Sequence, residues 1–567
     1  MLRTHTPASG RSLRVLALSI CLSLSASPVH DAVAGNADLN TTYIFGGGFI
    51  RSFSELPTRS AVGVLRPDGA LLIAGTAQAQ AYAPTDLGIA RHLVDGDVDY
   101  SYGPSSGQLV YDAFYMKNDE VSFVADADVG TYLGGRTLDG AVPSMTLARI
   151  THGGAPDYTF ASNGRISVSM GSGAAANAIA VQPDDKVLLL GYSLNASGKK
   201  DAAIVRVLPS GALDQTFGVG GKVSLPMSTD HDEVRGAVVR DDGSIVLAID
   251  SRVGTQNYTD VVALNSGGDL VPGFGSNGIV RLARTGYGLY ARGIAMDTQG
   301  RLVVASHALQ YSPYVQGMNM TRLNANGTLD AGYNGSGHLF TTLAPGGNYS
   351  VQALELLPTG EAIVVGGLHI PTSGTRTIFS ARFTAAGTLD TAYNNGVGYK
   401  LGDVGGGSHY DVSAQYLAVA ADGRVHVGGR IDGAMFNLRY QGDALDLLPA
   451  AMTFPTAYNI PRITQITSPA VTVSGLSAGA RVPIHVTGGA YSINGAAQTT
   501  LPGTVTNGDS IRLIHMSSSA YATTVTTTVT IGGLSPANNR SHVIGQRMQA
   551  SFSSITVQQS GGGVSEN

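Results

Sequence analysis

An eight-residue segment recurs along most of this chain at a nearly fixed spacing. Clear copies begin at Gly211, Gly327 and Gly387, and each reads Gly-x-Leu-Asp with an aromatic residue three positions after the aspartate. A fixed period of this length predicts a repeat architecture, in which each period is one structural unit that packs on its neighbours. The aromatic position falls every 57–60 residues, at Tyr43, Tyr102, Phe160, Phe217, Phe274, Tyr333 and Tyr393.

Each period contains four short apolar runs separated by turns. In one well-formed period, runs at 178–181 and 187–190 flank a turn at Pro183–Lys186, and further runs at 203–208 and 221–225 flank the motif. Pro, Asp and Gly favour tight turns, and four short strands per period are typical of a β-propeller blade. The sequence therefore predicts an all-β chain. The equivalent turns are expected at Pro67–Gly69, Asn118–Glu120, Asp241–Gly243, Thr298–Gly300, Pro358–Gly360 and Ala421–Gly423.

The two ends of the repeat region are incomplete in complementary ways. Residues 39–49 align without gaps on residues 213–223, yet no strands precede them. The last period has only a weak motif remnant, Ala444–Asp446, after its third strand. We therefore predict a seven-bladed propeller over residues 36–448, closed by residues 40–53 pairing with the strand that carries Phe436. Such closure would remove the exposed sheet edge of an open array.

The first 34 residues have the pattern of a secretory signal. Three arginines precede or interrupt an apolar stretch from Leu13 to Leu24. Ala32-Val33-Ala34 is a suitable cleavage site before Gly35, and Ser25-Ala26-Ser27 is the alternative. The only cysteine, Cys21, lies inside this segment. The mature chain is thus expected to be exported, whether periplasmic, extracellular or on the cell surface, with no disulfide, thiolate metal site or membrane span. Its formal charge is 32 − 39 = −7, which argues against nucleic-acid binding.

The period stops after Pro449, and a different pattern follows. Alternating apolar and polar residues from 462 to 558 form about seven short runs separated by turns such as Asn494-Gly495 and Asn507-Gly508. This length and pattern predict a small β-sandwich. Residues 449–461 are expected to be a linker, and the glycine-rich tail at 559–567 is expected to be disordered.

The pattern Gly-x-Leu-Asp-x-x-Phe-Gly-x-x-Gly resembles the delta-60 repeat of bacterial secreted and surface proteins. The resemblance covers residues 36–448 and implies a β-propeller, but no established activity and no catalytic residues. The copies around Asp97–Tyr100, Ala155–Tyr158 and Asp269–Pro272 depart from the pattern. The segments beginning at Val471 and Gly489 resemble immunoglobulin-like modules that are appended to bacterial extracellular proteins.

The motif residues themselves favour a structural interpretation. A carboxylate needed once per repeat is typical of a turn cap that accepts backbone N–H bonds, so Asp214, Asp330 and Asp390 are expected to be caps rather than metal ligands. Phe217 and its equivalents are expected to anchor the blade cores. No catalytic, cofactor-binding or metal-binding residue is predicted, and no cofactor is expected.

Two acidic clusters deserve comparison with metal sites. Asp230 to Glu233, which includes His231, has oxygen ligands that suit a cation, but such clusters are usually solvated loops. Asp95, Asp97 and Asp99 alternate as in a calcium loop, but no glutamate follows at the required distance. We therefore predict no metal at either cluster.

Tyrosines gather in the variable loops, at Tyr287, Tyr290, Tyr311 and Tyr314. Loop segments such as 309–317 and 369–377 vary most between repeats, and variable loops on one propeller face are where binding is expected. The leading hypothesis is a non-enzymatic scaffold that binds a protein or glycan through these loops. The alternatives are a hydrolase or lyase with its site at the propeller channel, and a structural cell-surface component.

Overall fold

The computed structural model describes residues 48–558, except for 52–59, 67–68, 79–83, 105–106, 114–116, 128, 140–141, 344–345, 358, 395, 403–410, 421–423, 441–448, 451, 453, 455–456, 459–460, 462, 477–480, 501–502, 520–524, 532–537 and 540–551. The predicted signal segment, the predicted tail, Tyr43 and the motif remnant at 444–446 lie outside the described residues. No helix in the described part of the chain has the length and hydrophobicity of a membrane span.

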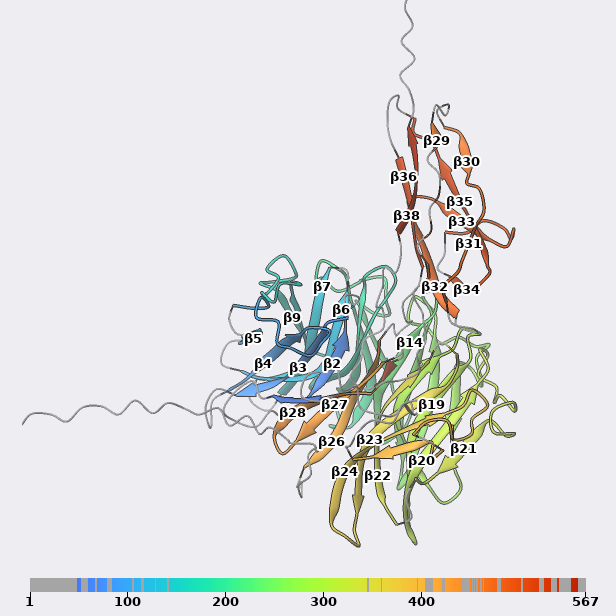
Figure 1. The fold of residues 1–567 in the computed structure, drawn as a ribbon. Coiled ribbons are helices and arrows are strands. Elements are labelled where there is room, and N and C mark those ends of the chain that lie inside the picture. The colour runs from blue at the N-terminus through green and yellow to red at the C-terminus, as the bar shows by residue number, and fades with distance from the viewer. Residues whose placement is uncertain are drawn as a thin grey trace, which may run out of the picture.

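The described residues before 449 form seven antiparallel sheets with four strands each, which we number as blades 1 to 7 in chain order (Figure 1). Blades 1 and 2 consist of β2 (Val62–Leu65), β3 (Leu71–Gln78), β4 (Thr85–His92) and β5 (Gln108–Tyr111), then β6 (Asn118–Ala127), β7 (Gly130–Asp139), β8 (Val142–Ile150) and β9 (Arg165–Val168). Blades 3 and 4 consist of β10 (Ala174–Val181), β11 (Val187–Leu194), β12 (Lys200–Val207) and β13 (Lys222–Leu225), then β14 (His231–Val239), β15 (Ile245–Val253), β16 (Gln256–Leu264) and β17 (Ile279–Leu282). The prediction of an all-β chain with seven four-stranded sheets is confirmed.

The remaining blades follow the same order. Blades 5 and 6 consist of β18 (Gly288–Met296), β19 (Leu302–Tyr311), β20 (Tyr314–Leu323) and β21 (His338–Thr341), then β22 (Asn348–Leu356), β23 (Ala362–Ile370), β24 (Thr375–Phe383) and β25 (Tyr399–Leu401). Blade 7 consists of β26 (Val412–Val419), β27 (Val425–Ile431), β28 (Ala434–Tyr440) and the N-terminal β1 (Gly48–Arg51). A short segment, β37 (Asn538–Asn539), adds to the free edge of β18 in blade 5.

The fourth strand of blade 7 comes from the other end of the repeat region. β1 pairs antiparallel with β28, with Gly48 opposite Leu438 and Arg51 opposite Met435. This is the pairing that the gap-free alignment of residues 39–49 predicts, here over residues 48–51. The first strands also contact one another in succession from β2 through β6, β10, β14, β18 and β22 to β26, and β26 contacts β2.

The apolar core lies between blades rather than inside them. One cluster joins blades 3 and 4 through Leu188 and Ile204 on one side and Val234 and Leu247 on the other. Another joins blade 1 to blade 7 through contacts that include Ile73 and Tyr416. A single four-stranded sheet is too small to bury a core alone, so each blade depends on its neighbours for stability.

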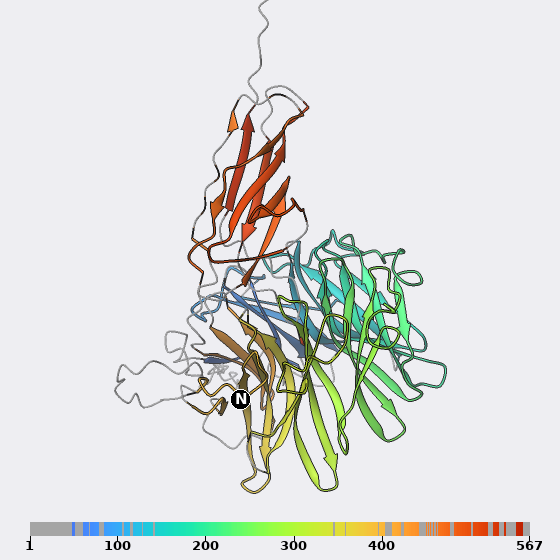
Figure 2. The ribbon, with the colours of Figure 1, turned by 90° about the vertical axis from the view of Figure 1, so that its right-hand side faces the viewer.

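The antiparallel order gives each blade two distinct ends. The turn between the first and second strands and the Gly-x-Leu-Asp segment lie at one end, which we call the motif face. The turn between the second and third strands and the connections between blades lie at the other end, which we call the loop face. The figures show the blades side by side, with the C-terminal sheets projecting away from them (Figures 1 and 2).

One predicted hairpin turn is wrong. Asn118, Asp119 and Glu120 belong to strand β6, and the turn of blade 2 is instead the tight connection from Ala127 to Gly130. The three polar residues at 118–120 imitate a turn in sequence, but their side chains have partners within the sheet. Asp119 accepts a hydrogen bond from Thr137, and Glu120 pairs with Arg136.

The C-terminal region forms two further sheets. One has the order β29 (Ala457–Tyr458), β38 (Phe552–Gln558), β36 (Val525–Ile531), β32 (Arg481–Thr487) and β34 (Gly503–Thr506). In the other, β35 (Ser510–Met516) pairs with β30 (Gln465–Thr467), β31 (Val471–Thr472) and β33 (Ala490–Ile493). Met452 and Phe454, which fall in the stretch predicted to be a linker, are buried in a cluster that also contains Val419 of blade 7 and Val473.

Candidate functional site

The motif aspartates occupy the same place in their blades. Asp214 Oδ1 accepts a hydrogen bond from the backbone N–H of Thr216 at 3.0 Å. Asp330 and Asp390 accept the equivalent bonds, from Gly332 at 2.9 Å and Ala392 at 3.0 Å. The predicted role of these carboxylates as turn caps is confirmed.

Each of these carboxylates also has an arginine partner eight residues earlier, on the third strand of its blade. Arg206 Nε lies 2.9 Å from Asp214 Oδ2, and both side chains are only 5% exposed. The same pair recurs at Arg322 with Asp330, at 2.7 Å, and it recurs at Arg91–Asp99, Arg149–Asp157 and Arg382–Asp390. Sequence reasoning missed this partner, although an arginine eight residues before each aspartate was a visible signal. The copies around Asp99 and Asp157, which look degraded in sequence, keep the pair.

The arginine also reaches the next blade. Arg206 Nη1 donates to the backbone oxygen of Ser266 at 2.5 Å, and Arg149 Nη1 donates to that of Pro209 at 2.7 Å. Arg322 donates in the same way to Ala385 of blade 6, and Arg439 of blade 7 donates to Val94 of blade 1. A planar guanidinium with five donors suits a site that must bind a carboxylate and a carbonyl at once.

The motif aromatic completes this arrangement. The Arg206 guanidinium lies 4.4 Å from the ring centre of Phe217, and Arg322 lies 4.8 Å from that of Tyr333. Gly218, directly after Phe217, has a left-handed φ of 52° and donates its N–H to the backbone oxygen of Gly267 in blade 4 at 2.8 Å. We call the arginine, the aspartate, the aromatic ring and these two bonds to the next blade the clasp.

The electrostatics of Asp214 reflect the clasp. Burial disfavours its charged form, but hydrogen bonds from Thr216 and the charges of Arg206 and Lys186 outweigh burial and lower the pKa to about 2. The pKa of Asp330 is also lowered, because bonds from Gly332 and Arg322 outweigh the effect of burial. These carboxylates are therefore fully charged near neutral pH and unsuited to proton transfer.

Blade 4 lacks the arginine–aspartate pair but not the bond to the next blade. Ala263 and Val271 occupy the two positions, in the degraded copy at Asp269–Pro272. Arg240, at the end of β14, instead donates to the backbone oxygen of Ala325 in blade 5 at 2.7 Å. Its guanidinium lies 6.0 Å from the ring centre of Phe274. An arginine from a different strand thus replaces the missing one.

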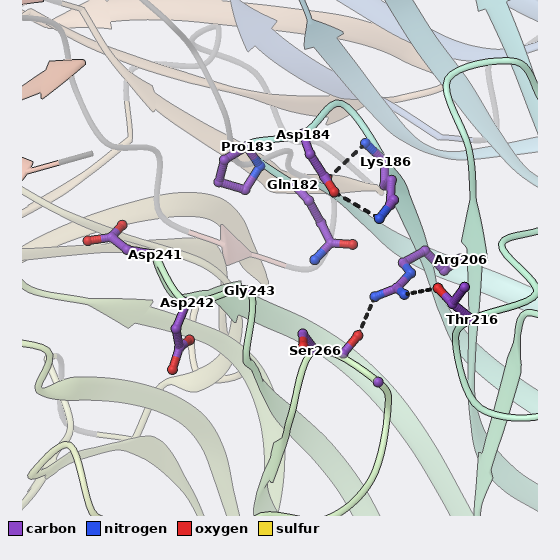
Figure 3. Close-up of a pocket in the computed structure, with 11 residues that line it drawn as sticks. Gln182, Pro183, Asp184, Lys186, Arg206, Thr216, Asp241, Asp242, Gly243 and Ser266 are labelled. Carbon is purple, nitrogen blue, oxygen red and sulfur yellow. Dashed lines mark hydrogen bonds and ion pairs between the residues drawn. The ribbon is translucent and has the colours of Figure 1, made fainter. Parts of the chain in front are cut away.

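A polar pocket of about 440 Å³ lies on the motif face between blades 3 and 4 (Figure 3). It is lined by Gln182, Pro183, Asp184, Lys186, Arg206, Thr216, Asp241, Asp242, Gly243, Ser266 and Gly267. Its two cations are already paired, Arg206 with Asp214 and Lys186 with Asp184 and Asp214. Asp242 accepts bonds from its own turn at Ser244. The pocket is therefore a hollow between two hairpin turns, and its two cations are held by carboxylates of blade 3.

The loop face has a different character, because its residues do not repeat. The first strands of blades 2 to 7 each contain a bulge, and the bulged residues are Ser122, Asn177, Arg235, Arg292, Gln352 and Gln415. The residue two positions before each bulge pairs with a residue of the second strand that also differs between blades, namely Arg136, Tyr192, Asp250, His307, Gly367 and Arg430. A scaffold needs the same residue in every blade, so residues that differ at equivalent positions are candidates for function.

Charged side chains from three blades meet on this face. Glu233 of blade 4 contacts Asn177 and Lys200 of blade 3 at 2.7 and 2.9 Å. Arg235 bridges Glu233 and Asp250, with both distances at 2.8 Å. Arg292 of blade 5 approaches Asp250 at 3.4 Å. We call these residues the loop-face network.

Tyrosines border the network on blade 5. Tyr290 Oη lies 3.3 Å from Tyr311 Oη and accepts a hydrogen bond from Asn257 at 2.9 Å. Tyr311 and Tyr314, opposite each other at a hairpin tip, are 67% and 55% exposed. His307 stacks near Tyr290 with ring centres 6.0 Å apart. Of the four tyrosines singled out from the sequence, three therefore gather here, whereas Tyr287 packs against Phe340 within its blade.

Two groups at this site have shifted pKa values. Burial, followed by the hydrogen bond with Tyr311, raises the pKa of Tyr290 to about 12. Burial, followed by the nearby charge of Arg292, lowers the pKa of His307 to about 4. His307 is therefore neutral at physiological pH, and among the described residues its Nδ1 has no hydrogen-bond partner.

The two acidic clusters noted in the sequence have their carboxylates engaged by protein groups. Asp230 pairs with Lys199 and accepts a bond from Gly254, and Asp232 is buried and accepts a bond from Ser228. Asp95 accepts a bond from the backbone of Asp97, while Asp99 belongs to a clasp. Within the described ranges, no group of three or more His, Cys, Asp or Glu side chains is arranged to hold a metal ion.

Two segments of the chain, residues 182–217 and 300–333, match a protein family described as a domain of unknown function (DUF5122) with a β-propeller fold. Each matched segment runs from the first hairpin turn to the motif aromatic and contains a complete arginine–aspartate pair. A comparison with curated proteins gives no significant match.

Solved structures that are similar to this chain include one that is described as a β-propeller. The β-propeller domain of the trilobed protease from Pyrococcus furiosus is 8% identical, with a TM-score of 0.36, over 69% of this chain and 95% of that one. An ulvan lyase is 10% identical, with a TM-score of 0.39, over 72% and 94%. An acylaminoacyl peptidase from Pyrococcus horikoshii is 9% identical, with a TM-score of 0.34, over 66% and 49%. These likenesses concern the fold alone.

The clasp predicts a large effect of removing one partner. Asp214→Ala should lower the free energy of unfolding by about 3–5 kcal/mol, because it leaves Arg206 buried without its carboxylate. Loss of a turn cap alone would cost about 0.5–2 kcal/mol. The double variant Arg206→Ala/Asp214→Ala, which removes both partners as Ala263 and Val271 do in blade 4, should cost less than the sum of its two single changes. Urea unfolding of all four proteins measures this coupling, and additive effects would contradict it.

The same cycle has a predicted pH dependence. The pKa of Asp214 falls from an ordinary 3.8 to about 2 on folding, so its contribution is complete above pH 3.8 and is lost as the pH falls toward 2. The difference in the free energy of unfolding between the parent and Asp214→Ala should therefore shrink as the pH falls from 3.8 to about 2.

Because Arg240 makes the bond to the next blade in blade 4, rebuilding the usual arginine–aspartate pair there should restore stability lost on removing Arg240. Arg240→Ala should destabilise the protein by about 1–3 kcal/mol, because the Ala325 carbonyl loses its donor. Adding Ala263→Arg and Val271→Asp, which rebuilds the clasp found in the other blades, should restore most of this loss. Arg252→Ala is the control, since that exposed arginine bonds only within its own turn. If Arg240→Ala left the stability unchanged, or if the triple variant were no more stable than Arg240→Ala, Arg240 would not be the replacement for the missing clasp arginine.

Proposed function

We propose that this protein is an exported β-propeller that binds a glycan through the loop face of blades 3 to 5. The observation that carries this proposal is the division between the two faces. The motif face repeats the same clasp residues, whereas the loop face gathers unlike polar and aromatic residues from three blades. Residues that the scaffold does not require are concentrated at one place, which is how binding sites are placed on repeat folds.

A sugar fits the chemistry of this surface better than an apolar ligand. Tyr311 and Tyr314 expose aromatic rings, which can stack on the apolar face of a sugar, and Tyr290 and Asn257 supply hydrogen-bonding groups next to them. The surrounding side chains are charged or polar, unlike the apolar centre of most protein interfaces. A protein partner is the alternative occupant.

Export is the second part of the proposal. The arginine-flanked apolar segment and the cleavage site before Gly35 support it. A cell-surface or secreted location would bring the loop face into contact with extracellular polysaccharide.

The architecture also extends beyond the seven sheets. We propose that the blades close into a ring in which β1 completes blade 7, supported by the β1–β28 pairing and by the hydrogen bond from Arg439 to Val94. We further propose that residues 462–558 form an immunoglobulin-like sandwich, supported by the two C-terminal sheets. Burial of Met452 and Phe454 supports a fixed attachment of that module rather than a free linker.

A hydrolase or lyase is the second candidate function. It is favoured by one observation: His307, whose Nδ1 has no hydrogen-bond partner among the described residues, lies beside Tyr290. A pKa of about 4 makes this imidazole a weak base. Against it, Glu233 and Asp250, the two carboxylates of the loop-face network, are both paired with arginines. Glycan binding therefore remains the better supported function.

Glycan binding should depend on the exposed tyrosines of the hairpin tip. With the chain from Gly35 onward, Tyr311→Ala/Tyr314→Ala should weaken binding to a glycan array at least about tenfold, since stacking contacts of this kind contribute on the order of 1 kcal/mol or more each. Tyr158→Ala is the matched control, because Tyr158 is equally exposed at 68% but lies on the motif face. An array with no bound glycan, or equal losses in both variants, would contradict the proposal. Product release from a bound glycan would favour the enzyme.

Ring closure predicts a global defect on truncation. Removing residues 36–55 deletes β1, leaves the edge of β28 unpaired and should cause aggregation together with loss of cooperative unfolding. Removing residues 559–567, which follow β38, is the control. Retention of full thermal stability and monomeric behaviour without residues 36–55 would contradict closure.

A further inference from the structure

The loop-face network holds more positive than negative charge. Arg235, Arg292 and Lys200 face Glu233 and Asp250 as the two carboxylates within contact distance. Arg235 and Arg292 both approach the same oxygen of Asp250, at 2.8 and 3.4 Å. One oxygen of Asp250 thus contacts two guanidinium groups, and its contact with Arg292 is the longer and weaker of the two.

Arg292 is the group left incompletely paired. Its Nη1 donates to its own neighbour, the Ala291 carbonyl, at 2.7 Å. Its Nε is buried and has no hydrogen-bond partner among the described residues. A buried guanidinium with unused donors costs free energy unless a ligand or a water supplies the missing acceptors. The side chain keeps 15% of its surface exposed, so an acceptor can reach it from solvent.

The position of Arg292 connects it to the exposed tyrosines. Its guanidinium lies 5.8 Å from the ring centre of Tyr290, and the Tyr290 hydroxyl lies 3.3 Å from that of Tyr311. A ligand that stacks on Tyr311 can therefore also reach the guanidinium of Arg292, which belongs to the same blade. His307, which also borders Tyr290, is uncharged near neutral pH, so the positive charge beside Tyr290 comes from Arg292.

We infer that the glycan bound at this face is acidic, and that its carboxylate or sulfate group binds to Arg292, with Arg235 beside it. This inference rests on the proposed glycan-binding function and adds the class of sugar. Planar guanidinium groups bind carboxylates and sulfates through paired charge-assisted hydrogen bonds. The anion would occupy the donors of Arg292 that Asp250 leaves free, and the sugar ring would lie toward Tyr311.

The test compares three oligosaccharide probes on the chain from Gly35 onward. These are a linear uronic-acid oligomer, a sulfated oligomer without carboxylates and a neutral glucose oligomer of similar length. At least one acidic probe should bind at least about tenfold more tightly than the neutral one, and Arg292→Gln should remove that preference, since a hydrogen bond to a charged group is worth about one to two factors of ten. The matched control is Arg252→Gln, an exposed arginine at the loop-face end of β15 that should leave the preference unchanged.

A second measurement covers the case in which Arg292→Gln fails to fold. Binding of the acidic probe to the parent should weaken steeply as NaCl rises from about 0.05 M to about 0.5 M, because screening shortens the reach of the charges. Binding of a neutral sugar should not. Equal affinity for neutral and acidic probes without salt dependence would overturn the acidic assignment and leave glycan binding intact. Absence of binding to all three probes, together with an empty glycan array, would overturn the proposed function itself.

Discussion

In each blade that has a clasp, an arginine on the third strand binds both the motif turn of its own blade and a backbone carbonyl of the next blade. In blade 3, Arg206 binds the carboxylate that caps its own motif turn, and the same guanidinium donates to a carbonyl of blade 4. Four short strands cannot form a stable unit alone, so the contact between blades decides whether any blade is folded. The apolar clusters between neighbouring blades provide most of the buried surface, while the clasp fixes how the blades are aligned at the motif face.

The charge balance of the clasp explains why its arginine and its aspartate can be replaced together but not one at a time. An arginine at 5% exposure without its carboxylate would leave an unpaired buried charge, which is more costly than having neither residue. Blade 4 follows this logic, because Ala263 and Val271 replace both partners together. The bond to blade 5 is still made, by Arg240 from another strand. The bond between blades is thus kept even where the residues that usually make it are absent.

This arrangement leaves the opposite face free to vary. Because the clasp and the first hairpin turns occupy the motif face, the residues at the loop-face ends of the strands have no shared structural task. In blades 3 to 5, Lys200 and Glu233 near that end and Arg235, Asp250 and Arg292 farther along the first and second strands contact one another across blade boundaries. The proposed binding function follows from this separation of tasks.

The sequence predicts local features better than contacts between distant residues. The repeat period, the turn at Pro183–Lys186 and the cap at Asp214 all follow from short-range patterns, and the structure agrees with them. The turn at Asn118–Glu120 is wrong because three polar residues resemble a turn when their cross-strand partners are unknown. The exchange by Arg240 joins residues 85 positions apart, and the loop-face network joins three blades. Neither could be predicted, since no local pattern marks which side chains meet.

Amide hydrogen exchange of the chain from Gly35 onward tests the central claim that the motif turns join the blades. Gly218, Gly275 and Asn334 directly follow the motif aromatics and donate their N–H groups to the next blade at 2.8, 2.9 and 2.7 Å. We predict that these three turn amides exchange as slowly as amides in the first strands, because both open only when blades separate. Exchange at the rate of an exposed turn would show that the blades are held by their apolar clusters alone and would contradict the clasp.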